Sequence, residues 1–117
     1  MNHQHHLKNL IQQENGYIGY CEGCQSYNVA YKNSLFILSE SEFACYRQVM
    51  ADRIAMRPFF TTHDKEWLLK TPMPNYYMLF STNELDELIQ MMDEASLMME
   101  VDQILRAPTE KNSKPNS

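Results

Sequence analysis

A stretch of this sequence occurs twice, and this internal repeat constrains the fold more than any other feature. Residues 36–50 (FILSESEFACYRQVM) align with residues 78–92 (MLFSTNELDELIQMM) at an offset of 42 positions. Ser39 falls on Ser81, and apolar residues coincide at six further pairs of positions. Self-similarity at a fixed period indicates that a chain builds the same supersecondary unit more than once. The sequence therefore predicts an architecture made of two related halves.

Each half contains a capping box, which is a serine followed three positions later by a glutamate. The pairs are Ser39 with Glu42 and Ser81 with Glu84. In a capping box the serine hydroxyl accepts a hydrogen bond from the glutamate N–H, and the carboxylate accepts one from the serine N–H. We therefore expect a helix to begin directly after each serine, and the second helix to extend to about Arg106.

Short runs of aromatic and β-branched residues precede both helices and predict strands. The runs are residues 17–21, 26–31 and 35–38 in the first half, and 59–62, 67–70 and 76–80 in the second. Short connections between such runs favour antiparallel pairing of neighbours. We therefore expect an α+β fold with a mostly antiparallel sheet built from two β-β-β-α pseudo-repeats, residues 17–57 and 59–106. The two main helices are expected to pack on the sheet.

The chain of 117 residues is expected to form a single domain over residues 15–106. Residues 1–14 are predicted to be a flexible N-terminal segment with a spacing that permits one short helix. Residues 107–117 are predicted to be a disordered tail, because they are almost entirely polar. The sequence begins without the apolar stretch of a signal peptide and contains no run of about 18 apolar residues. A cytoplasmic protein without membrane contact is expected.

The charge distribution argues against a nucleic-acid partner. The formal net charge is −5, and residues 84–102 include seven acidic residues and no Lys or Arg. Proteins that bind nucleic acids neutralise phosphates with Lys and Arg, so this segment would repel a phosphate backbone. A solvated helix face explains the acidic residues, and a basic protein partner is the alternative explanation.

The predicted C-terminal helix is apolar on more than one side. Met91, Met98 and Leu105 widen its main apolar stripe, and Val101 lies on a different side together with Leu97 and Ile104. A helix that is apolar on several sides must bury several sides. Met91, Met98, Val101 and Leu105 are therefore predicted to form an interface, either with a second copy in a homodimer or with another protein partner. The alternative is that the methionines only fill gaps in the core, for which their flexible side chains are suited.

The only recognisable chemical motif is the C-x-x-C sequence formed by Cys21 and Cys24. Two thiolates at this spacing can bind one tetrahedral zinc ion, and the glycine between them is expected to let the turn close. A complete zinc site needs two further ligands. The candidates are His3, His5, His6 and His63, of which His63 and His6 are taken as the predicted ligands; the N-terminal histidines are alternatively part of a tail that binds no specific metal. The alternatives are two turn cysteines that bind no metal, or a thiol-redox pair. Redox C-x-x-C pairs usually lie at a helix N-terminus, whereas this pair lies between two predicted strands.

Motifs of known catalytic machinery are missing from the sequence. It contains no Gly-rich phosphate loop, no G-x-S-x-G elbow and no H-E-x-x-H metal motif. The favoured hypothesis is a non-enzymatic interaction or structural module that holds either no cofactor or a zinc ion. The alternative is a thiol-redox protein or another small enzyme that uses Cys21 and Cys24.

The residues from Gly16 to Phe43 follow the pattern G-Y-x-x-Y-C-x2-C-x5-A-Y-x-N-x4-L-S-x2-E-F. This stretch resembles a family of small uncharacterised bacterial proteins classed as a domain of unknown function, in which a C-x-x-C turn between strands leads into a capped helix. The resemblance covers about a quarter of the chain and does not extend beyond Arg57. It implies that Cys21 and Cys24 form a shared site, and it offers no catalytic residues.

Overall fold

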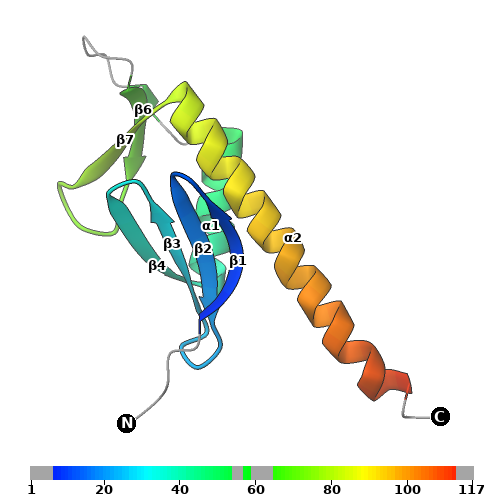
Figure 1. Cartoon of the computed structure of the whole chain (residues 1–117). Coiled ribbons are helices and arrows are strands. Elements are labelled where there is room, and N and C mark those ends of the chain that lie inside the picture. Colours follow the sequence, from blue (N-terminus) through cyan, green and yellow to red (C-terminus); the bar gives the residue numbers. More distant parts are fainter. Residues whose placement is uncertain (1–6, 54–56, 59–64, 113–117) are drawn as a thin grey trace.

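The computed structural model describes residues 7–53, 57–58 and 65–112, which form two antiparallel sheets and two helices (Figure 1). The elements in chain order are β1 (Leu7–Gln13), β2 (Gly16–Cys21), β3 (Ser26–Tyr31), β4 (Ser34–Ser39), α1 (Glu40–Asp52), β5 (Arg57–Pro58), β6 (Lys65–Lys70), β7 (Tyr77–Ser81) and α2 (Thr82–Asn112). The predicted α+β class and antiparallel pairing are confirmed. The strands form two sheets where one was expected, with the orders β1-β2-β3-β4 and β5-β6-β7.

The first sheet is a meander in which each strand pairs with the next along the chain. β2 begins at Gly16, where a Cβ atom would lie 2.1 Å from the carbonyl oxygen of Ala30 on β3. Only a residue without a side chain permits this approach. Gly16 is therefore required for a steric reason and not for its backbone conformation, since its φ is not positive.

The predicted short helix within residues 1–14 is wrong, because residues 7–13 form the strand β1. β1 pairs with β2, with an irregularity in the register between Asn9 and Ile11. Such a bulge shifts the alternation of side chains, and Leu10 is buried at this point. Lys8 forms an ion pair of 2.5 Å with Asp102 of α2. Strand pairing and contact with a distant helix thus decide the conformation of a segment whose local spacing also permits a helix.

The second sheet contains β6, β7 and the two-residue β5. The strands predicted at residues 67–70 and 76–80 correspond to β6 and β7, while the strand predicted at 59–62 lies outside the described residues. In the described part of the chain, four strands precede α1 and three lie between α1 and α2. The internal repeat of 42 residues therefore stays a prediction.

Both predicted capping boxes are present at the starts of the two helices. The Ser39 hydroxyl accepts from the Glu42 N–H at 3.1 Å, and the Glu42 carboxylate accepts from the Ser39 N–H at 2.8 Å. At α2 the corresponding distances between Ser81 and Glu84 are 3.1 and 2.9 Å. α1 ends at Asp52 and is capped by Arg53, which has a left-handed φ of 60°. The helix starts predicted from the sequence are confirmed.

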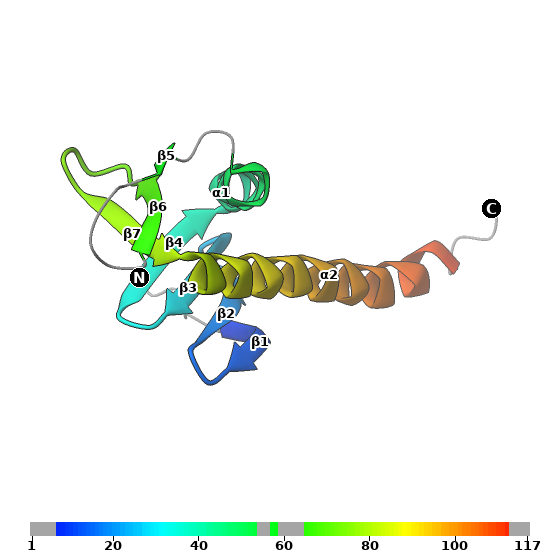
Figure 2. The same cartoon turned by 90° about the horizontal axis from the view of Figure 1, so that it is seen from above.

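The two sheets and the two helices share one hydrophobic core. α2 packs on β1 and β2, α1 packs on β3 and β4, and the helices lie on the same face of the first sheet (Figure 2). The start of α2 also contacts β6 and β7. Its buried residues include Leu10, Ile18, Val29, Leu38, Phe43, Met50, Leu69, Phe80, Leu85, Leu88, Met91 and Met92. Phe43 and Leu85, which are equivalent under the 42-residue offset, both belong to this core.

α2 is longer than the sequence predicted. It has 31 residues, which corresponds to about 46 Å. Residues 107–112, expected to be part of a disordered tail, continue the helix. The C-terminal part of α2 projects beyond the sheets (Figures 1 and 2). Within the described ranges, no helix is both long and apolar enough to cross a membrane.

Candidate interaction surface

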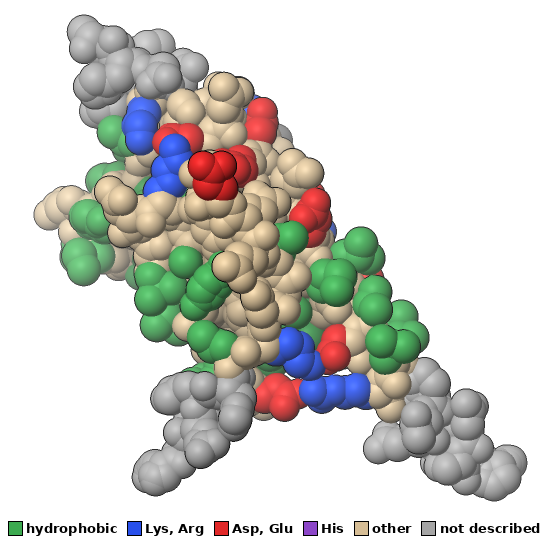
Figure 3. Space-filling view, viewed as in Figure 1, with side chains coloured by type: hydrophobic (Ala, Val, Ile, Leu, Met, Phe, Trp, Pro, Cys, Tyr) green, Lys and Arg blue, Asp and Glu red, His purple; other side chains and the backbone are tan. Residues whose placement is uncertain are grey.

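The C-terminal half of α2 carries exposed apolar side chains on its outer side. We call this set the α2 stripe, and its members are Leu97, Met98, Val101, Ile104 and Leu105. Their side chains are 57%, 46%, 39%, 62% and 70% exposed, respectively. At about 100° per residue, they span roughly 120° of the helix circumference. Figure 3 shows apolar side chains along the outer side of the projecting end of α2.

The α2 stripe lies on the side of the helix opposite to the core. Met92, Ala95 and Met99 are buried, and their side of the helix is roughly 150° away from the stripe. Nearer the start of α2 the outer side is polar, since Asp86 and Asp93 form ion pairs there with arginines in and directly after α1. The outer side of α2 is therefore solvated over its first half and apolar over its second half.

Three of the four predicted interface residues, Met98, Val101 and Leu105, belong to the α2 stripe. Met91 was wrongly included, because it is completely buried in the shared core and offers no surface to a partner. Leu97 and Ile104 share an apolar side of the helix with Val101 in the sequence but were left out of the predicted interface set. Leu97 lies four positions before Val101 and Ile104 three positions after it, and this spacing places them on the same side.

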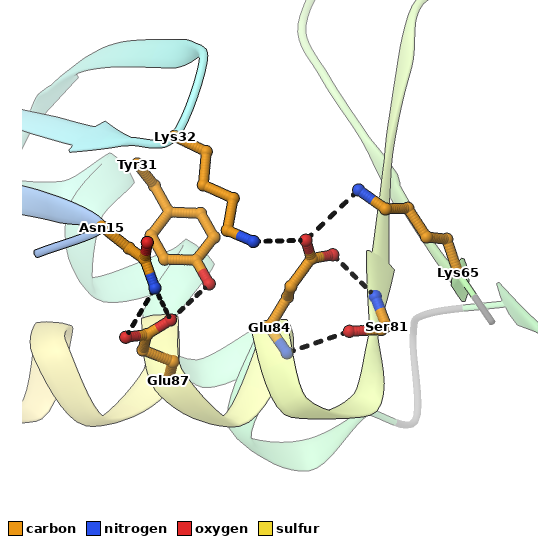
Figure 4. A network of polar contacts seen from close by, with 7 residues as sticks. All are labelled: Asn15, Tyr31, Lys32, Lys65, Ser81, Glu84 and Glu87. Atoms are coloured by element: carbon orange, nitrogen blue, oxygen red, sulfur yellow. Dashed lines mark hydrogen bonds and ion pairs between the residues drawn. The ribbon is translucent and has the colours of Figure 1, made fainter.

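The start of α2 is fixed between the two sheets by Glu84 (Figure 4). Its carboxylate lies 2.9 Å from Nζ of Lys32, between β3 and β4, and 3.2 Å from Nζ of Lys65 on β6. Burial alone would raise the pKa of this carboxyl, but the Ser81 N–H and the two lysines outweigh it and lower the pKa to about 2. Glu84 therefore joins the helix start to both sheets as a permanently charged group.

Glu87 forms a second polar contact one turn further along α2 (Figure 4). The Tyr31 hydroxyl donates to its carboxylate at 2.7 Å, and the Asn15 side chain donates at 3.0 Å. These two hydrogen bonds lower the pKa of Glu87. Burial, followed by the bond to the carboxylate, raises the pKa of Tyr31. Each polar group in this cluster has a partner, which is typical of a structural anchor and not of a reactive site.

Cys21 and Cys24 lie in the turn between β2 and β3. Cys21 is buried and Cys24 is exposed, and the Cys24 N–H donates to the Cys21 sulfur at 3.3 Å. The turn closes through a hydrogen bond of 3.3 Å from the Gln25 N–H to the Glu22 carbonyl. Gln25, with a φ of 55°, supplies the left-handed conformation, and Gly23 does not. The role expected for the glycine is therefore wrong.

The thiol-redox alternative stays a prediction. Hydrogen bonding to Cys21, followed by desolvation, raises the pKa of the Cys24 thiol above its usual value. A redox pair needs one cysteine that reacts as its thiolate. The raised pKa of Cys24 therefore makes it the less reactive thiolate former, and it does not decide the role of the pair.

The zinc site stays a prediction. His6 and His63 lie outside the described residues. Among the residues that are described, no group of three or more metal-binding side chains comes together. Two of the predicted ligands, Cys21 and Cys24, are thus placed close together, and the other two are not placed.

A comparison with protein-family models places this chain among known sequences. Residues 1–109 match the model of a family of unknown function, DUF6686. The chain belongs to the DUF6686 family. No curated protein and no solved structure gives a significant match.

The DUF6686 match extends well past the stretch from Gly16 to Phe43 that carried the sequence resemblance. It includes the turn of Cys21 and Cys24, and it also includes the whole α2 stripe. Both features therefore lie within the matched range. Since the function of DUF6686 is unknown, membership assigns no catalytic or binding residue.

Proposed function

We propose that this protein is a non-enzymatic interaction module that forms a homodimer through the α2 stripe. The observation that supports this proposal is the switch of the outer side of α2 from polar to apolar where the helix leaves the sheets. Contiguous exposed apolar surface rimmed by polar residues marks protein interaction sites in soluble proteins. An apolar patch is also complementary to its own copy, as a two-fold interface requires.

The size of the α2 stripe fits a dimer of moderate affinity. The exposed fractions of its five side chains together correspond to about 2.7 fully exposed side chains. At about 2 kcal/mol per buried side chain, covering the stripe in both copies contributes about 11 kcal/mol. Association costs about 4–15 kcal/mol in lost translational and rotational freedom. At the low end of this cost about 7 kcal/mol remains, which corresponds to a dissociation constant of roughly 10 μM, and any larger cost makes the dimer weaker.

The charges around the stripe favour antiparallel helices in the dimer. Glu94 lies one turn before the stripe on the same side of α2. In a parallel pair the two copies of Glu94 would lie next to each other and repel. In an antiparallel pair centred on Val101 they lie at opposite ends, roughly 20 Å apart. This arrangement also directs the two sets of sheets away from each other.

Sedimentation equilibrium over low to high micromolar concentrations tests the proposal. We expect the wild-type protein to shift from monomer to dimer, and Leu105→Glu to remain monomeric. Leu105 is 70% exposed, so a charge there leaves the fold intact. Gln103→Glu adds the same charge two residues away, outside the stripe, and should dimerise like the wild type. A wild-type protein that is purely monomeric at high micromolar concentration contradicts the proposal.

A further inference from the structure

A second apolar surface lies on a different part of the molecule, along the outer edge of β4. It is a groove of about 440 Å³ between β4 and the loop that joins β6 to β7. One wall is formed by residues 33–38, and the other by Thr71, Pro72, Met73, Tyr76 and Met78. Figure 3 shows apolar side chains gathered over these two segments. We call this feature the β4 groove.

The backbone of β4 has hydrogen-bonding capacity on the side of the groove. β4 is the last strand of its sheet, and among the described residues no strand pairs with its outer edge. In an antiparallel ladder every second residue directs its N–H and C=O away from the neighbouring strand. β4 therefore presents a row of donors and acceptors that another extended segment can match. Soluble proteins usually protect such edges with charged residues or proline, and β4 contains neither.

The side chains around the groove are apolar and largely accessible. Leu35 and Ile37 on β4 are 57% and 63% exposed, and Met73 and Tyr76 on the opposite wall are 61% and 53% exposed. None of the residues that line the groove is charged. A charged segment would lose hydration here without gaining a partner. The groove is therefore complementary to an uncharged, apolar segment.

The dimensions of the groove favour a single extended segment as the occupant. The six residues of β4 extend over roughly 20 Å, at about 3.4 Å per residue. The groove follows this whole length, because residues 33–38 form one of its walls. An extended segment of about six residues can therefore lie along β4, at the spacing of about 4.8 Å between neighbouring strands.

We propose that the β4 groove binds an extended, uncharged, apolar segment of a partner protein, which pairs with β4 as a fifth strand of the first sheet. Main-chain hydrogen bonds to the edge of β4 give affinity, as in other cases of strand addition. Alternate side chains of the segment contact Leu35 and Ile37 on one side. The loop carrying Met73 and Tyr76 covers the segment from the opposite wall.

A titration with a synthetic peptide tests this proposal. The probe is a capped heptapeptide of alternating threonine and valine, which is uncharged and strand-forming. We expect saturable changes in the NMR signals of the backbone amides of residues 34–39 and of the loop at 71–76. The same peptide methylated at every backbone nitrogen keeps its side chains but has no N–H donors, so it should not bind. Equal binding of the methylated peptide contradicts strand pairing.

Two variants of the protein distinguish the groove from other surfaces. Ile37→Lys places a charge on the edge of β4 and should weaken peptide binding about tenfold or more. Leu7→Lys makes a similar change on β1, at the opposite edge of the same sheet, and should leave binding unchanged. Absence of saturable binding, or signal changes confined to the α2 stripe, would overturn the proposal. Dilution-dependent signals at residues 34–39 without peptide would also overturn it, because they identify a second copy as the occupant.

Discussion

Replacing Glu84 with glutamine tests whether this carboxylate joins α2 to the two sheets. Its pKa falls from 4.5 to about 2, and each unit corresponds to about 1.36 kcal/mol, so the upper limit of its contribution near neutral pH is about 3 kcal/mol. The Glu84 side chain is 12% exposed, but Lys32 and Lys65 are 44% and 46% exposed, and solvent screens both pairs. We therefore expect Glu84→Gln to lower the free energy of unfolding by about 2–3 kcal/mol at pH 7.

The pH dependence has a defined sign. Because the pKa of Glu84 is lower in the folded protein, its contribution is complete above the unfolded value of 4.5 and is lost as the pH falls toward about 2. The difference between wild type and Glu84→Gln should fall to less than half by about pH 3. Urea unfolding at low ionic strength, followed by circular dichroism from pH 7 to pH 3, measures this difference.

Glu42→Gln is the matched control. It makes the same chemical change in the capping box of α1, where the hydrogen bonds described for Glu42 are those with Ser39. Without lysine partners of this kind, it should cost about 0.5–1 kcal/mol at pH 7. Equal losses in the two variants, or a loss in Glu84→Gln that does not change between pH 7 and pH 3, would refute the role of the lysines.

Four further predictions concern the core, the hydrogen bond between Tyr31 and Glu87, and the cysteine turn with its predicted zinc site. Leu85→Ala should lower the free energy of unfolding by about 2–5 kcal/mol, because Leu85 is completely buried. The exposed control Leu97→Ala should change the stability of the monomer by less than about 0.5 kcal/mol. Urea unfolding measures both changes. Tyr31→Phe removes the hydrogen bond to the α2 carboxylate and should cost about 1.5–3 kcal/mol in the same assay. Iodoacetamide should alkylate Cys24 only at a higher pH than it alkylates cysteine in a short peptide, because the pKa of the Cys24 thiol is raised. Alkylation at a lower pH than in the peptide would contradict this raised pKa. Metal analysis of protein purified without chelator tests the zinc site, and only a trace of zinc contradicts it.

The sequence predicts features that depend on neighbours along the chain. The capping boxes at Ser39 and Ser81 are complete within four residues, so both helix starts could be identified. The strands from Gly16 to Ser39 are rich in β-forming residues and joined by short turns, which determine their pairing. The membership of a family of unknown function was also indicated by this stretch, and the match to residues 1–109 confirms it.

Features that depend on distant contacts could not be predicted in the same way. β1 is a strand because it pairs with β2 and contacts α2 through Lys8, and neither contact is visible in the local spacing. Met91 is buried because several elements meet around it, whereas Met98, two turns later, is exposed where those elements end. The β4 groove is formed by strand and loop segments about 35 residues apart, so its existence follows only from the tertiary structure.

At two turns of the backbone, a residue with a long charged side chain adopts a conformation that glycine adopts more easily. Lys32 and Arg53 have left-handed φ angles of 52° and 60°, for which glycine is better suited by about 1 kcal/mol. Their side chains nevertheless reach Glu84 and Asp86 on α2. Substituting glycine at either turn would remove the backbone strain but also the ion pair with α2. The change in stability of such a variant is therefore a small difference between these two opposing effects. Exchanging arginine and lysine keeps the charge, so it should be tolerated more readily than substitution by glycine.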